Sequence, residues 1–132
     1  MPPFLLAAAA ALAFGAPAQA QNYDGRYRIA PDADCSAPAG SPGFLRIEEE
    51  TLYGAESVCR MTEPVDVRDM DATLYDMVCT GEGAAWRERA LVMRGAEDEL
   101  VLVWNGYAFA YPACPAPPVR PRPRPTTIAS GN

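Results

Sequence analysis

LVLVWNGYAFAY, residues 100–111, is the stretch that decides the fold of this chain. An apolar run and an alternating aromatic run flank Asn105-Gly106, and Asn-Gly in such a position is the strongest short-range signal of a β-hairpin. The β-branched and aromatic residues on both sides favour extended backbone. The sequence therefore predicts two antiparallel strands, at Leu100–Trp104 and Tyr107–Tyr111.

Strand patterns of similar length precede this hairpin. Turn-forming residues separate them at short intervals, which is typical of an antiparallel meander. The predicted strands cover residues 25–29, 44–47, 51–54, 57–67, 72–80 and 85–93. The sequence thus predicts an all-β fold, a small antiparallel meander that forms a barrel or a sandwich. A helix competes only over residues 82–92, where Glu, Ala, Arg and Leu favour it.

The longest predicted hairpin has its turn centred near Asp69. Residues equally far from this centre should face each other across the two strands. This register places Cys59 opposite Cys79 and Glu63 opposite Tyr75. Directly opposed residues of antiparallel strands are close enough for a disulfide.

Four cysteines, an even number in a short chain whose first residues indicate export, as described below, predict two disulfides. The hairpin register favours Cys59–Cys79, which leaves Cys35 to bond Cys114. The two other pairings of these four residues are alternatives at this stage. No C-x-x-C spacing is present, so neither a redox motif nor a zinc knuckle is indicated.

Residues 1–20 have the pattern of a cleavable export signal. An apolar run over residues 4–14 is followed by Gly15, Pro17 and the small-x-small triplet Ala18-Gln19-Ala20. The run is too short for a permanent membrane span. The sequence therefore predicts a periplasmic or secreted protein without a transmembrane segment in its mature form.

The mature chain divides into two parts. Residues 21–114 form the predicted disulfide-stapled β domain. Residues 115–132 are rich in proline and arginine, and proline fits neither helix interiors nor central strands. This second part is predicted to be a disordered tail.

Charge and composition exclude several classes of function. All 17 acidic residues lie between Asp24 and Glu99, together with eight of the 11 arginines, so this region has a net charge of −9. Such a charge disfavours nucleic acid and permits a cationic protein partner. The chain contains no histidine, which excludes Ser-His-Asp and Cys-His nucleophile systems and His-based metal sites.

The aromatic residues near residue 107 are the candidate ligand face. Tyr107, Phe109 and Tyr111 alternate along one strand, so they share one of its faces. Packing in the core is the ordinary interpretation, and an exposed stacking surface is the alternative.

Acidic residues give two further candidates. Four aspartates surround one predicted turn, but the EF-hand pattern fails there, so we expect no metal or other cofactor. Glutamates could supply the carboxylate pair of a glycoside hydrolase. They are Glu48, Glu49, Glu50, Glu56, Glu63, Glu82 and Glu88.

Turn and cysteine motifs carry a family resemblance. They are Asp34-Cys35, Glu56-x-x-Cys59, Cys79-x-Gly81-Glu82-Gly83-x-x-Trp86 and Tyr111-x-x-Cys114. With these motifs the chain resembles small, uncharacterised exported four-cysteine proteins of proteobacteria. In size, export and β content it is also loosely similar to periplasmic lysozyme inhibitors. That second resemblance implies an inserting loop with serine and lysine, whereas this chain contains no lysine.

These observations predict a bacterial, non-enzymatic exported protein that binds a ligand or assists another envelope component, as a monomer. Inhibition of a basic secreted enzyme such as lysozyme is the second hypothesis. A small carboxylate-dependent hydrolase is the third.

Overall fold

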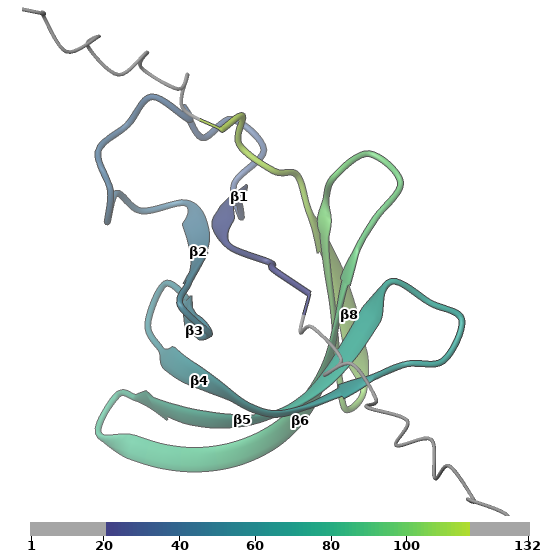
Figure 1. The fold of residues 1–132 in the computed structure, drawn as a ribbon. Helices are drawn as coiled ribbons and strands as arrows, with labels where there is room; N and C mark the ends of the chain where they lie inside the picture. Colours follow the sequence, from purple (N-terminus) through teal and green to yellow (C-terminus); the bar gives the residue numbers. More distant parts are fainter. Residues whose placement is uncertain (1–20, 117–132) are drawn as a thin grey trace, which may run out of the picture.

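Eight antiparallel strands follow one another in chain order, and each pairs with its neighbours in sequence (Figure 1). The computed structural model describes residues 21–116. The strands are β1 (Gly25–Arg28), β2 (Phe44–Glu48), β3 (Thr51–Tyr53), β4 (Val58–Asp66), β5 (Ala72–Gly81), β6 (Ala84–Arg94), β7 (Leu100–Trp104) and β8 (Tyr107–Tyr111). The predicted all-β meander is therefore confirmed. The predicted export signal and most of the predicted tail lie outside the described residues.

No helix occurs within residues 21–116, so none there is long and apolar enough to cross a membrane. The helical alternative over residues 82–92 is wrong, because this segment forms most of β6. β6 pairs with β5 along ten successive residues. This long ladder outweighs the weak local preference for helix.

Tight turns set the registers of the hairpins. Glu49 and Glu50 have φ angles of 47° and 59°, and Glu82 and Gly83 have 49° and 75°. Each pair forms a two-residue turn with positive φ at both positions, the type I′ pattern that matches the twist of the strands. The predicted Asn-Gly hairpin is also confirmed, although Gly106 alone has a positive φ there.

The sheet curls until its two ends meet, which makes a nearly closed barrel (Figure 1). At the seam, β1 bonds to the residues that follow β8. The Arg28 amide donates to the Pro112 carbonyl at 2.8 Å, and the Cys114 amide donates to the Arg26 carbonyl at 2.7 Å. The Cys35–Cys114 disulfide lies beside these bonds and covalently joins the two sides of the seam.

Both predicted disulfides are confirmed. Cys59 of β4 faces Cys79 of β5 directly, with 4.0 Å between their Cα atoms. All four cysteines are thereby bonded. Two disulfides are compatible with an oxidising compartment outside the cytoplasm.

The expected pairing of Glu63 with Tyr75 is wrong. The register of β4 and β5 shifts by one between Thr62 and Val65. Two residues of β4 therefore stand where β5 has one, which is a β-bulge. Glu63 takes a left-handed φ of 51° at this point.

The core fills the inside of the barrel. Inward-facing side chains of β1 to β7 contribute, together with Tyr23 from the segment before β1, and Tyr111 of β8 packs against them. The Tyr23 hydroxyl donates to the Val92 carbonyl at 3.0 Å and contacts the Thr73 hydroxyl at 3.0 Å. The Tyr27 hydroxyl donates to the Tyr23 carbonyl at 2.6 Å. The chain from Tyr23 onward is thus an integral part of the barrel.

Burial raises the pKa of Tyr75 to about 12 and also raises the pKa values of Tyr23 and Tyr27. Unfolded tyrosine titrates near pH 10, so above that pH the unfolded chain binds fewer protons than the folded one. We therefore expect the free energy of unfolding to fall as the pH rises from about 10 to 12. Tyr75 alone should account for about 2–3 kcal/mol of this loss.

Denaturant unfolding at a series of alkaline pH values measures this effect. The Tyr75→Phe variant is the control, because it cannot ionise at this position and should show a shallower decline. A free energy of unfolding that stays constant over the same range in the wild-type protein would contradict the prediction.

Candidate functional site

Tyr107, Phe109 and Tyr111 lie on the inner face of the sheet. Directly opposed residues of antiparallel strands share a face, and Phe109 pairs with Leu102, which is buried in the core. In the same ladder Tyr107 pairs with Trp104, and Tyr111 with Leu100. The prediction that the three residues share a face is borne out by this register.

Their exposure differs along the strand. Tyr111 is partly buried and packs against the core, as the ordinary interpretation expects. Tyr107 and Phe109, by contrast, are 53% and 46% exposed. The barrel is closed beside Tyr111, where residues 112–114 pair with β1, and it is open beside Tyr107. Tyr111 therefore fits the interpretation as a core residue, and Tyr107 and Phe109 have the exposure that the alternative requires.

The three rings form a continuous row. Phe109 and Tyr111 stack with ring centroids 5.7 Å apart and planes inclined by 21°. Tyr107 meets Phe109 edge to face, also at 5.7 Å. Burial raises the pKa of Tyr111, which keeps its hydroxyl neutral over the physiological range. We call Tyr107, Phe109 and Tyr111 the aromatic row.

Two neighbouring strands extend this apolar surface on the inner face. Trp86 of β6 pairs with the buried Cys79 and is 39% exposed. Trp104 of β7 packs against the core beside the aromatic row. Glu88, two residues after Trp86, lies on the same face of β6 and is half-buried. It places a carboxylate on this part of the inner face, and the sequence pattern alone did not distinguish Glu88 from the other glutamates.

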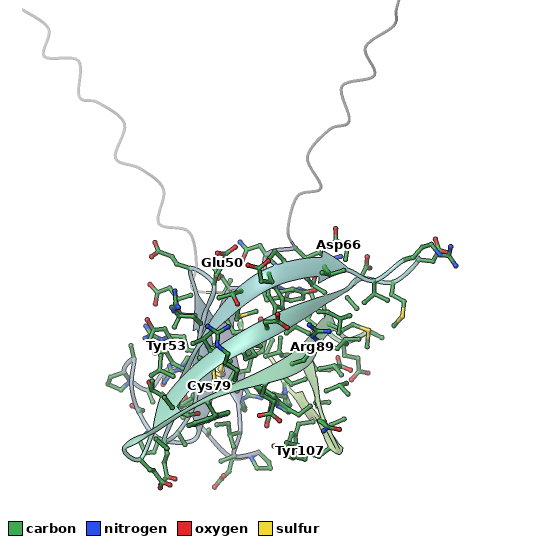
Figure 2. All side chains as sticks on the ribbon, turned by 90° about the horizontal axis from the view of Figure 1, so that it is seen from below. Glu50, Tyr53, Asp66, Cys79, Arg89 and Tyr107 are labelled. Carbon is green, nitrogen blue, oxygen red and sulfur yellow. A yellow bond between two sulfur atoms is a disulfide. The ribbon has the colours of Figure 1, made fainter. Side chains whose placement is uncertain are left out.

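A group of acidic residues lies at the end of the barrel opposite Tyr107. Figure 2 shows Glu50 and Asp66 at one edge of the molecule and Tyr107 at the other. A pocket of about 220 Å³ at the acidic end is lined by Asp24, Glu49 and Glu50, with Tyr23 and Tyr75. The three carboxylates are exposed to solvent. Glycosidases desolvate the carboxyl group that serves as general acid, and these three side chains lack such burial.

The four aspartates around the β4–β5 turn do not converge. Asp76 accepts a hydrogen bond from the Arg89 guanidinium at 2.9 Å on the outer face of the barrel. Asp71 lies 3.5 Å from the Gln21 amide instead. Within residues 21–116, no group of three His, Cys, Asp or Glu side chains is arranged to hold a metal ion.

Two arginine–aromatic pairs on the outer face were not foreseen from the sequence. Arg26 lies 3.7 Å from the centre of the Phe44 ring, and Arg46 lies 4.2 Å from that of Tyr53. Arg26 also donates to backbone carbonyls of the loop between β1 and β2, including that of Pro38 at 2.9 Å. Its guanidinium is therefore used to hold this loop against the sheet.

Comparison of the chain with protein-family models, with characterised proteins and with solved structures finds no match in any of the three.

Proposed function

We propose that this protein is a non-enzymatic binding protein of the periplasm or the extracellular space, and that the aromatic row is its ligand face. The exposure of Tyr107 and Phe109 on the core-facing side of β8 carries the proposal. Other side chains on the inner face of this ladder, such as Leu100 and Leu102, are buried. Large apolar side chains gathered on a surface are typical of interaction sites.

The aromatic side chains of this face are suited to binding a partner through their large contact area. Aromatic rings give large contact areas with few rotatable bonds, and Tyr and Trp are enriched among residues that dominate binding energy. A cationic protein partner fits the net charge of −9 of residues 24–99, because the negative field would speed the approach of the partner. Added salt would screen this field and weaken the binding. We propose that the protein acts as a monomer in this role.

Inhibition of a basic secreted enzyme such as lysozyme is the second candidate. The acidic end of the barrel favours it, since Asp24, Glu49 and Glu50 converge there on one pocket. Figure 2 shows Glu50 of this pocket and Tyr107 of the aromatic row at opposite edges of the molecule. Substitutions at the two ends can therefore tell the candidates apart.

We expect the Tyr107→Ser/Phe109→Ser variant to lose its partners from an envelope extract. Removing two half-exposed aromatic anchors should weaken binding by about 2–4 kcal/mol, which is at least about 30-fold in affinity. Val65→Ser is the matched control, because Val65 is an exposed apolar residue of β4, remote from the aromatic row. Capture of the same proteins by both variants would contradict the proposal.

Immobilised egg-white lysozyme and cytochrome c extend the measurement to the second candidate. Tight binding to lysozyme alone, with loss of its hydrolytic activity, and sensitivity to Glu49→Gln/Glu50→Gln would favour inhibition. Equal weak binding to both basic proteins would indicate only a charged surface.

A further inference from the structure

β8 has a free backbone edge beside the aromatic row. Across the seam, the Pro112 carbonyl and the Cys114 amide bond to β1. In an extended strand the N–H and C=O groups of alternate residues point to the same edge. The backbone groups of Ala108 and Ala110 therefore point to the edge from which Pro112 and Cys114 reach β1.

No strand of the described chain occupies this edge. Beyond Arg28 the chain turns away from the seam, and the amides of Ile29 and Ala30 both donate to the Gly43 carbonyl of the following loop. Within residues 21–116, no backbone hydrogen bond joins Ala108 or Ala110 to a segment other than β7. Two donors and two acceptors are therefore available along the open side of β8.

β8 also lacks the features that usually protect an edge strand. Natural edges carry charged residues, proline or a bulge, or are covered. Residues 107–111 read YAFAY, with neither charge nor proline, and pair with β7 without a shift of register. On the outer face, Ala108 and Ala110 carry only a methyl group each. A further strand can thus approach this edge closely.

We propose that the free edge of β8 binds an extended basic segment of another protein as a ninth strand. This inference rests on the proposed function and names the partner of the same site. Main-chain hydrogen bonds to Ala108 and Ala110 would hold the segment, and its apolar side chains would lie against the aromatic row.

Charge identifies the occupant. A second copy of the chain would bring together two domains that each carry a net charge of −9 over residues 24–99. The chain's own residues 115–125 contain six prolines, which lack the amide donors of a strand. A basic segment, in contrast, is complementary to the negative charge of residues 24–99, and Asp34 lies next to Cys35 of the seam disulfide. Hydrogen bonds from Ser36 lower the pKa of the Asp34 carboxyl, so it is ionised at neutral pH.

Amide hydrogen exchange in the mature protein tests the proposal. The probe is a synthetic peptide of alternating arginine and valine, and a peptide with glutamate in place of arginine is its control. We expect the amides of Ala108 and Ala110 to exchange rapidly in the free protein and at least about tenfold more slowly with the arginine peptide bound. The glutamate peptide should give no protection.

The Ala110→Pro variant provides a second measurement. Proline at this position removes a donor on the free edge, is tolerated in edge strands and leaves the aromatic row in place. Its affinity for the arginine peptide should fall at least about tenfold. Ala110→Ser, which keeps the amide, should bind the peptide as the wild type does. The exchange experiment does not require this variant to fold.

Four outcomes would overturn the proposal. Ring signals of Tyr107 and Phe109 that shift without protection of Ala108 and Ala110 would restrict binding to the side chains, and the proposed function would stand. Failure of the arginine peptide to bind, or equal binding of both peptides, would reject the basic strand. A dimer in sedimentation that Ala110→Pro dissociates would make a second copy the occupant.

Discussion

Replacing Cys35 and Cys114 together by serine is expected to lower the free energy of unfolding by about 4–5 kcal/mol, a large share of the stability of so small a domain. This disulfide joins residues 79 apart in sequence. It therefore removes much conformational freedom from the unfolded chain. It also lies at the seam, where only a few backbone bonds hold the two ends of the sheet together.

The control is the Cys59→Ser/Cys79→Ser variant. Its disulfide closes a separation of 20 residues within an already paired hairpin. We expect a smaller loss there, about 3 kcal/mol. Denaturant unfolding gives both values, and amide exchange at Arg28, whose N–H donates to Pro112 across the seam, shows whether the seam opens first. A smaller loss for the seam variant than for the hairpin variant would refute this account.

The Tyr23→Ala substitution should lower the free energy of unfolding by about 3–5 kcal/mol, the usual range for truncating a large buried aromatic side chain. Tyr23 is only 3% exposed and meets the Tyr75 ring edge to face at 6.3 Å. Its hydroxyl bonds to the Val92 carbonyl and contacts Thr73. The substitution would therefore leave both a cavity and unpaired polar groups.

Tyr23→Phe separates the two contributions. It keeps the ring and removes only the hydroxyl, so we expect a loss of about 1 kcal/mol. Thermal or denaturant unfolding of both variants measures the difference. If both substitutions lower the free energy of unfolding by the same amount, the Tyr23 ring does not pack as described.

The hairpin chemistry of the sequence was sufficient to predict much of this fold. Asn105-Gly106 and the turn at Asp69 located two hairpins, and the second gave the Cys59–Cys79 pair. The bulge at Glu63 escaped prediction because glutamate gives no local signal for a left-handed φ. Tyr23 escaped as a core residue because it lies outside any strand.

The candidate site was predictable only in part. Alternation alone shows that Tyr107, Phe109 and Tyr111 share a face. Their exposure, however, depends on where the barrel closes. Closure is set by the pairing of Tyr27 with Ala113 and by the departure of the loop after Arg28. Contacts between segments this far apart leave no periodic pattern in the sequence.

The order of the strands also implies an order of events during folding. All seven ladders of the sheet join segments that are neighbours in the chain, and such local contacts form quickly. The contact between Tyr27 and Ala113, in contrast, needs a long loop to close, which is entropically costly. β1 can pair with β2 early, but its contact with Ala113 must wait until the last part of the domain is available. Until then the chain is a curled but open sheet, and its interior tyrosines are accessible to chaperones and proteases.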